Sequence, residues 1–401
     1  MIHSYKFKNF FSFADWAEVS FVVNKQVPES DLVFISPAGI RLSKLMTVIG
    51  ANASGKTNVL KPLPFLSWFI CRSFSSLNPE DKIPIESHFF VDSDKSEFEI
   101  EFETSGEIYR YALVANKERV YEEGLYIKSK KFFSYLFKRE WNDEYSKYDI
   151  TQQKFGFIKS EAEKVRANAS LISTAAQYDV SCARELVAFF SGFDFNVDYG
   201  GRTPFETDDI FDASEMFYGE PEIRKQMTKL LCDFDFGISD VIIEKRKIKN
   251  KADEEYDIFV PFGLHQSGNK THKLPFVYES SGTKRAYILL NKFLPLLNSG
   301  LDSGGIVIID EMESDLHPEM LRPLLELFIN PETNKRNTQI IFTCHAHEVL
   351  EIVDKSQVQL VEKNTEGESE AWRLDSMKGV RRDDNLFAKY RAGTYGAVPD
   401  L

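Results

Sequence analysis

The sequence predicts an α/β fold, in which a buried parallel sheet is joined to an antiparallel β subdomain and a mostly helical insertion. Three observations predict this arrangement. A glycine-rich segment follows the apolar run Leu45–Ile49 and leads directly into a helical pattern, as in a strand–loop–helix unit. Two further apolar runs, Ile306–Ile309 and Gln339–Thr343, are typical of strands covered on both faces of a parallel sheet. Glu97–Phe102 and Ile108–Val114 alternate in polarity around a turn, which indicates a β-hairpin.

The N-terminal part contains further strands and one interrupted helix. Residues 2–23 alternate loosely in polarity and carry aromatic and β-branched residues, so we expect two strands joined near Asp15. The helix after the glycine-rich segment begins at Lys56 and is kinked or restarted at the prolines that follow it. Residues 118–127 are expected to continue the hairpin.

From about residue 128 the sequence becomes charged and rich in aromatic residues, and we expect a mostly helical insertion. Its expected helical segments are Phe132–Lys138, Glu161–Ile172, Val180–Phe190 and Ala213–Phe234. The chain is therefore divided into an N-terminal lobe (residues 1–127), the insertion (128–235) and a C-terminal lobe (236–401).

The C-terminal lobe returns to strand patterns. Its expected elements are the strands Val241–Lys249 and Tyr256–Phe262 with a hairpin tip at Asn250–Glu255, the helices Leu289–Leu297 and Met320–Ile329, and the strand pair Gln357–Glu362 and Glu370–Leu374. The tail from Arg381 onward is polar but contains aromatic residues. It either docks on the head or a partner, or is a frayed terminus.

The composition is typical of a globular protein, with 43% hydrophobic and 28% charged residues. A net charge of −13 argues against a general nucleic-acid-binding coat but leaves room for a local basic groove. The N-terminus lacks a signal-peptide pattern, and no apolar run approaches the ~18 residues that span a bilayer. We expect a cytoplasmic protein with its 34 phenylalanines mainly in the core. Its four cysteines are expected to be free thiols: Cys71, Cys182, Cys232 and Cys344.

The segment Gly50–Thr57 reads G-x-x-x-x-G-K-T, which predicts a loop that binds the phosphates of a nucleotide. Glycines let backbone N–H groups face the phosphate oxygens, and the helix that follows adds its positive dipole end. Lys56 would reach the terminal phosphates and contribute to catalysis, and the Thr57 hydroxyl would ligate Mg²⁺. The candidate nucleotide-binding residues here are Gly50, Asn52, Ser54, Gly55, Lys56, Thr57 and Asn58. An ordinary glycine turn before a helix is the alternative.

Polar residues follow the two other buried strands. Asp310 and Glu311 come directly after Ile306–Ile309, at the carboxyl end, where parallel sheets bind ligands. We expect Asp310 to hold Mg²⁺, directly or through water, and Glu311 to polarise the attacking water as a general base. His345 follows the next strand and would stabilise charge at the γ-phosphate. The neighbouring His347 is expected to lie on the following helix without a chemical role.

The segment Glu279–Thr283 (ESSGT) precedes an apolar helix. A Ser-Gly turn at a helix N-terminus can bind an anion, but an ordinary capping turn looks the same.

The order of these motifs resembles the ATP-binding cassette (ABC) fold, and within it the non-transporter branch of SMC, RecF and double-strand-break-repair ATPases. The chain looks most like the stand-alone AAA family ATPases that resemble the ATPase part of OLD nucleases. The resemblance implies an ABC-ATPase head with a P-loop parallel sheet. It covers both ends of the chain well and the insertion poorly. The supporting segments outside the core motifs are Tyr5–Phe13, Ser281–Arg285, Leu316–Pro318 and Tyr390–Pro399.

The resemblance also implies roles for several residues. Residues 279–283 would be the signature motif, with Ser280, Ser281 and Gly282 facing the γ-phosphate of ATP bound to a second protomer. Glu279 stands where the family has Leu, and Thr283 where it has Gln.

Two further family elements can be assigned in the same way, and a third cannot. Ser314–His317 would be the D-loop, with Asp315 and Leu316 crossing the dimer interface, and His345 would be the switch histidine. The family's Gln-loop is not visible in its expected place, and neither Asn78 nor His88 is assigned to it.

Sharing ATP between two chains implies a homodimer that closes on ATP and opens after hydrolysis, with a higher oligomer left open. The chain ends about 50 residues after His345 with no nuclease constellation, so an OLD-like nuclease domain is expected to be absent. Family members of this size resemble bacterial phage-defence ATPases that act with a separately encoded nuclease, often of TOPRIM or HNH type. The leading hypothesis is such a defence ATPase, which senses infection and controls its partner.

The alternative hypothesis is a DNA-repair or DNA-maintenance ATPase that acts on DNA directly. Its basic candidates are Lys128–Lys131, Lys138–Arg139 and Lys245–Lys251. We prefer to interpret each as a solvated hairpin tip or helix face. A transporter subunit is disfavoured, because no membrane-coupling surface is evident.

Overall fold

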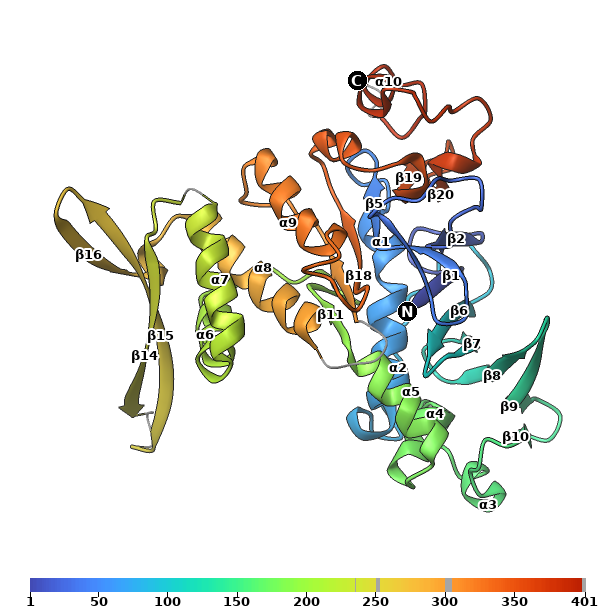
Figure 1. Ribbon diagram of the computed structural model, residues 1–401. Coiled ribbons are helices and arrows are strands. Elements are labelled where there is room, and N and C mark those ends of the chain that lie inside the picture. The colour runs from blue at the N-terminus through green and yellow to red at the C-terminus, as the bar shows by residue number, and fades with distance from the viewer. Residues whose placement is uncertain (235, 250–252, 300–304, 399–401) are drawn as a thin grey trace. The chain divides into compact units, whose positions relative to one another are not determined.

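The computed structural model describes residues 1–234, 236–249, 253–299 and 305–398 (Figure 1). The described residues form two compact units, the first made of residues 1–202, 305–312 and 328–398, and the second of the described residues within 203–299 and 313–327. The fold is α/β with one mostly parallel sheet and separate antiparallel sheets, as predicted. The predicted domain boundaries after residues 127 and 235 stay predictions.

A six-stranded sheet in the first unit has the order β11-β17-β18-β5-β19-β20. Its strands are β5 (Leu45–Ile49), β11 (Phe193–Phe195), β17 (Ile306–Ile309), β18 (Gln339–Thr343), β19 (Val358–Lys363) and β20 (Ser369–Arg373). All pairings are parallel except that of the edge strand β20 with β19. Every residue of β5, β17 and β18 is buried, which explains their continuous apolar sequences.

A seven-stranded antiparallel sheet in the same unit has the order β10-β9-β8-β7-β6-β1-β2. The strands are β1 (Ile2–Lys8), β2 (Ala17–Ser20), β6 (Ser96–Thr104), β7 (Glu107–Ala115), β8 (Val120–Ser129), β9 (Phe132–Asn142) and β10 (Lys147–Gln152). The predicted N-terminal strand pair and the hairpin with its continuation are confirmed. A small hairpin, β3 (Val33–Ile35) with β4 (Arg41–Ser43), lies between the first pair and β5.

The helix predicted at Phe132–Lys138 is wrong, because this segment belongs to strand β9. β9 pairs with β8, so that Phe133 lies opposite Lys128 and Tyr135 opposite Tyr126. Such cross-strand partners stabilise a strand but come from outside the segment, so its charged and aromatic composition did not reveal them.

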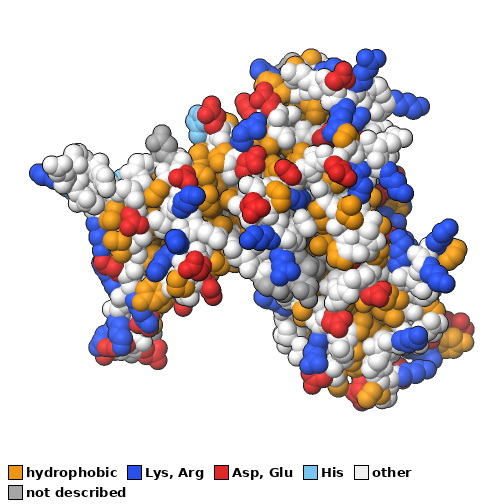
Figure 2. Space-filling model, viewed as in Figure 1, with side chains coloured by type: hydrophobic (Ala, Val, Ile, Leu, Met, Phe, Trp, Pro, Cys, Tyr) orange, Lys and Arg blue, Asp and Glu red, His pale blue; other side chains and the backbone are white. Residues whose placement is uncertain are grey.

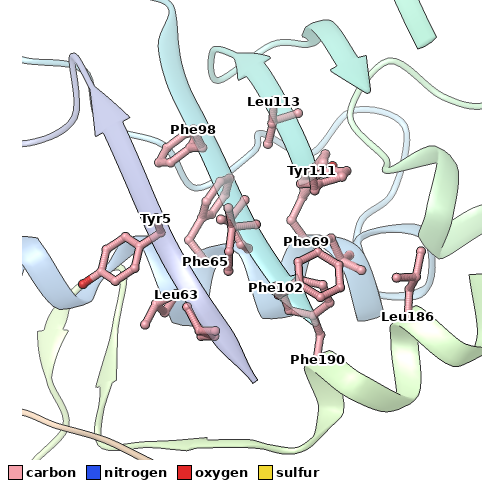
Figure 3. Close-up of a cluster of buried hydrophobic side chains, with 14 of the residues drawn as sticks. Tyr5, Leu63, Phe65, Phe69, Phe98, Phe102, Tyr111, Leu113, Leu186 and Phe190 are labelled. Carbon is pink, nitrogen blue, oxygen red and sulfur yellow. The ribbon is translucent and has the colours of Figure 1, made fainter. Parts of the chain in front are cut away.

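The helix α2 (Pro62–Ser76) packs its buried side against the antiparallel sheet (Figure 1). It follows α1 (Lys56–Leu60), and the predicted restart falls at Pro62. Figure 3 shows Phe65 and Phe69 of α2 among side chains of the sheet, such as Phe98 and Phe102. The phenylalanines therefore build the core. The other helices of this region are α3 (Lys159–Ala162), α4 (Leu171–Gln177) and α5 (Ser181–Ser191).

Two of the predicted helical segments differ in detail. Glu161–Ile172 contains the end of α3 and the start of α4 with a non-helical stretch between them. Ala213–Phe234 is divided between α6 (Thr207–Gly219) and α7 (Pro221–Asp233). The second break has a clear cause, because Pro221 lacks the N–H that a continuous helix would need.

Arg139 was a candidate for a basic DNA-binding surface, with a solvated face as the preferred interpretation, and the structure contradicts both for this residue. Its side chain is fully buried and pairs with Glu123 at 3.5 Å. Its guanidinium also donates to the backbone carbonyls of Val165, Arg166 and Ala169, at 3.1, 2.8 and 2.8 Å. Arg139 therefore joins β9 to the segment before α4 and is inaccessible to a nucleic acid.

The second unit contains a three-stranded antiparallel sheet, β14 (Asp240–Lys249), β15 (Glu255–Ser267) and β16 (Lys270–Pro275). The helices α6 and α7 pack against α8 (Ser281–Asn298), and α6 also packs on β15. The predicted strand pair is confirmed, although residues 250–252 of its predicted tip lie outside the described residues. The basic side chains of β14 are held in ion pairs, for example Lys245 with Asp257 at 2.8 Å.

The C-terminal tail docks on the first unit, which is one of the two outcomes left open by the sequence. Tyr390, in α10 (Leu386–Arg391), is buried and donates its hydroxyl to the Ala397 carbonyl at 2.7 Å. The Ala397 N–H in turn donates to the Glu362 carboxylate of β19 at 2.6 Å. The Tyr390 ring also contacts His347, so that histidine has a packing role.

The remaining described helices are α9 (Leu321–Ile329) and the 3₁₀ turns Phe276–Tyr278, Pro318–Met320, His347–Glu351, Lys355–Gln357 and Leu374–Ser376. Over the described ranges, no helix combines the length and apolar character needed to cross a membrane. All four cysteines are free thiols, as predicted.

Candidate nucleotide-binding site

The segment Gly50–Thr57 forms a loop between β5 and α1, as the sequence predicts. Two positions require glycine. Gly55 has a φ angle of 109°, which side chains rarely adopt, and a Cβ there would lie 2.9 Å from the Ser12 hydroxyl. A Cβ on Gly50 would collide with the backbone carbonyl of Val361. The loop is thus packed closely enough that only backbone atoms fit at these positions.

Lys56 and Thr57 connect this loop to its surroundings. The Lys56 side chain is buried, and its Nζ donates to the carbonyls of Gly50 and Ala51 at 3.0 and 2.8 Å. The Thr57 Oγ1 donates to Oδ2 of Asp310 at 2.9 Å. Two motifs that are 253 residues apart in sequence therefore meet through a direct hydrogen bond.

Asp310 is held in place by side chains from both neighbouring strands. Its Oδ1 accepts from the Thr343 hydroxyl at 2.6 Å, and Thr343 also accepts from the Glu311 N–H at 2.7 Å. Asn196, directly after β11, accepts from the Asp310 N–H at 2.7 Å and donates to the Asp310 carbonyl at 3.0 Å. The carboxyl ends of β11, β17 and β18 are thereby joined in one network.

These residues line a cleft of about 780 Å³ in the first unit. Its lining residues are Ser12, Asn52, Ala53, Gly55, Lys56, Thr57, Asn58, Asp310, Glu311, Thr343, His345 and Lys363. The volume is in the range of small-molecule sites. The cleft therefore brings together the predicted phosphate-binding, metal-binding and catalytic residues of this unit, whose roles stay predictions.

Gly50 and Ser54 belong to the loop but do not line the cleft. The buried Ser54 hydroxyl has no hydrogen-bond partner within the part of the chain that the structure describes. A buried hydroxyl without a partner is costly, so Ser54 is a position where the loop is not fully satisfied by the described residues.

The donor atoms next to the loop fit a magnesium ion. The Thr57 hydroxyl and the Asp310 carboxylate are 2.9 Å apart, and Asp310 is nearly inaccessible to solvent. Hydroxyl and carboxylate oxygens are hard ligands of the kind that Mg²⁺ prefers, together with phosphate oxygens. Thr57 and Asp310 are therefore the residues that would hold the ion.

Several residues at or near the cleft were not predicted as functional, and Thr343, Ser12, Lys363 and Asn196 are among them. Ser12 accepts from Asn58 Nδ2 at 2.9 Å, and it lies within the N-terminal segment Tyr5–Phe13 that matched the family. Lys363 ends β19, and the rule that ligands bind at the carboxyl ends of parallel strands would have indicated it. Asn196 gave no local signal, because its importance depends on the pairing of β11 with β17.

The sequence left the Gln-loop unassigned, and the structure does not favour either residue considered for it. Asn78 bonds to the neighbouring Asp81, and the His88 N–H donates to Asn9. Neither residue lines the cleft.

The predicted signature motif lies in the second unit, at the start of α8. Ser280 is the N-cap residue, and its hydroxyl accepts from the Thr283 N–H at 3.1 Å. Glu279, which replaces the family's Leu, is buried and bonds to His265 at 2.7 Å. Ser281 is exposed at the first turn of the helix.

Gly282 approaches the predicted D-loop closely. A Cβ on Gly282 would lie 3.1 Å from the carbonyl oxygen of Asp315, which itself has a φ angle of 64°. The signature and D-loop residues are thus neighbours within the second unit.

Comparisons with known proteins show which family this chain belongs to. A family model described as "AAA domain, putative AbiEii toxin, Type IV TA system" matches residues 45–351, which is more than half of the chain. Among solved structures, the SMC head domain from Thermotoga maritima is similar, with a TM-score of 0.42 and 14% identity over 93% of this chain and 98% of that chain. The chain therefore belongs to the AAA-domain family described as putative AbiEii toxin of the Type IV TA system.

Proposed function

We propose that this chain binds and hydrolyses ATP, and that two copies close around ATP to form a molecular switch. The observation that carries the proposal is the hydrogen bond from Thr57 to Asp310, at 2.9 Å. It places the phosphate loop beside the carboxylates at the end of β17, in one cleft with Lys56, Glu311 and His345. Family membership supports the same conclusion.

The loop would bind the phosphates of a nucleoside triphosphate. Backbone N–H groups of Gly50–Thr57 would donate to phosphate oxygens, and the start of α1 would add its dipole. Lys56 Nζ would exchange the carbonyls of Gly50 and Ala51 for charged phosphate oxygens, which form stronger hydrogen bonds. A bound Mg²⁺ would neutralise charge on the β- and γ-phosphates.

Hydrolysis requires a base next to the γ-phosphate. Glu311 lines the cleft directly after Asp310, and its carboxylate would accept a proton as a water oxygen bonds to the γ-phosphorus. The bond from the γ-phosphorus to the bridging oxygen breaks, and ADP leaves with that oxygen. His345, in the same cleft, would donate to the phosphoryl oxygens as charge develops there.

The second copy would complete each site. Ser280 and Gly282 at the start of α8 would donate hydrogen bonds to the γ-phosphate bound by the partner, so that ATP binds the closed dimer more tightly than the open chain. Hydrolysis removes the γ-phosphate and with it this difference in affinity, which returns the dimer to the open state.

A complementation experiment tests whether the sites are shared. Lys56→Ala lacks the phosphate-loop lysine, and Ser280→Arg blocks the signature turn. Each variant alone is expected to hydrolyse ATP slowly, and an equal mixture should regain activity. One site of the mixed dimer then combines an intact Lys56 with an intact Ser280. Phosphate release and light-scattering mass are measured for each variant and the mixture.

Ser280 also caps α8, so Ser280→Arg is expected to cost about 1 kcal/mol of stability. Asn385→Ala is the control for this loss of stability, because it removes the N-cap of α10 and Asn385 does not line the cleft. If the mixture is no more active than the sum of its parts and its mass does not increase with ATP, the sites are not shared between chains.

We further propose that the switch acts in bacterial anti-phage defence and controls a separately encoded effector nuclease of TOPRIM or HNH type. The description of its family as a toxin of a Type IV TA system supports such a context. When the chain is expressed from its native locus, a nuclease encoded beside it is expected to co-purify in the presence of ATP. The Lys56→Ala variant should retain less of it. If the wild-type chain and the Lys56→Ala variant retain the same amount of nuclease, the ATP site does not control the partner.

Direct action on DNA receives less support from the described surface. Arg139 is buried, and the cations of β14 pair with acidic residues, as Lys249 does with Asp253 at 2.9 Å. On the face shown in Figure 2, Lys and Arg side chains are interspersed with Asp and Glu side chains. Neighbouring charges of both signs weaken the attraction for a phosphate backbone.

A further inference from the structure

Arg202 contacts the predicted general base. Its Nη1 donates to Oε2 of Glu311, and the two side chains are 31% and 41% exposed. Glu311 itself has a φ angle of 50°, in the left-handed region that only a few per cent of non-glycine residues adopt. The carboxylate predicted to accept a proton from water is therefore already bonded to a guanidinium.

A short hairpin holds Arg202 in this position. Its strands β12 (Val197–Asp198) and β13 (Gly201–Arg202) pair antiparallel, with Val197 opposite Arg202. Oδ1 of Asp198 accepts from the N–H groups of Gly200 and Gly201 at 2.7 and 3.2 Å, which fixes the turn. At its base, Asn196 makes two hydrogen bonds to the Asp310 backbone. The hairpin is thus anchored beside Asp310 and reaches Glu311 through Arg202.

The hairpin also borders open space. Asp198 and Tyr199, together with Phe195 before them, line a cavity of about 520 Å³ in the first unit. Trp68 and Arg72 of α2 also line this cavity. Tyr199 is mostly exposed and the turn contains two glycines, so the tip of the hairpin can shift while Val197 at its base stays in the core.

We propose that Arg202 is a positioning residue that holds Glu311 away from the attacking water until the hairpin moves. A carboxylate bonded to a guanidinium has fewer lone pairs with which to accept from a water molecule. A charge-assisted hydrogen bond must break before the carboxylate is released. This inference rests on the proposed ATP hydrolysis and adds a control on its chemical step.

Substitution of Arg202 tests the proposal. Arg202→Ala is expected to raise kcat for ATP about twofold to fivefold with an unchanged KM, the range typical of a partly exposed ion pair. Arg202→Lys keeps the charge without the planar fork and should give a smaller increase. In the Glu311→Gln background, Arg202→Ala should have no effect on kcat, because no carboxylate remains to be held. Arg184→Ala is the control, since it breaks an exposed pair with Asp179 elsewhere in the same unit.

The outcomes separate this inference from the proposed function. If Arg202→Ala and Arg202→Lys both leave kcat unchanged, the contact does not restrain Glu311 and the inference is wrong. A lower kcat with either variant also overturns it, and would place Arg202 at the phosphoryl oxygens instead. If the wild-type chain neither binds nor hydrolyses ATP, the proposed function itself fails. Thermal unfolding confirms that each variant is folded, and Arg202→Lys serves if Arg202→Ala is not.

Discussion

Glu311→Gln is expected to slow ATP hydrolysis about 10²- to 10⁴-fold, the contribution of a well-placed general base, while ATP binding is retained. Glutamine has the same shape as glutamate but cannot accept a proton from water at neutral pH. The variant keeps the backbone bond from residue 311 to Thr343 and leaves Asp310 and Thr57 untouched. Binding of the phosphates should therefore be intact and only the chemical step impaired.

Single-turnover phosphate release measures the rate, and titration with labelled ATP measures binding. Because ATP persists in this variant, the closed dimer should accumulate and double the mass seen by light scattering. Glu348→Gln makes the same change of charge at an exposed position just after β18 that does not line the cleft, and it should behave as wild type. A wild-type rate for Glu311→Gln would show that another group accepts the proton.

The site residues found from sequence share one property, which is that their signal is local. Gly55 and Lys56 belong to a fixed spacing, and Asp310 follows a run of apolar residues. A short motif of this kind encodes both the backbone shape and the chemistry, so it can be recognised without the rest of the fold. The same holds for α8, whose N-cap at Ser280 follows a standard capping pattern.

Two of the missed residues, Asn196 and Arg202, owe their position to distant strand pairing. Asn196 and Arg202 reach Asp310 and Glu311 only because the three-residue strand β11 pairs parallel with β17. No periodicity is visible in a strand of that length. The prediction that Arg139 is exposed was wrong because it relied on a local signal, whereas the partners of this residue lie elsewhere in the chain. A lysine–arginine pair indicates a charged surface, but buried carbonyls and Glu123 gave the arginine enough partners to enter the core.

Loss of ATP binding is the expected result of Lys56→Ala. A hydrogen bond to a charged group contributes about 1.5–3 kcal/mol, so ATP should bind about tenfold to over a hundredfold more weakly. The substitution also leaves the carbonyls of Gly50 and Ala51 without the ammonium group that they bond to. Part of the loss therefore comes from a loop that is no longer held in its binding conformation.

Lys363→Ala separates the specific contact from the general positive charge of the cleft. Lys363 lines the same cleft but is exposed at the end of β19, so water and salt screen its charge. We expect this variant to weaken ATP binding much less than Lys56→Ala, and to do so mainly at low salt. Calorimetric titration of both variants at two salt concentrations measures the difference. Equal losses would mean that the cleft attracts ATP by net charge, and that the loop around Lys56 does not recognise phosphate by its geometry.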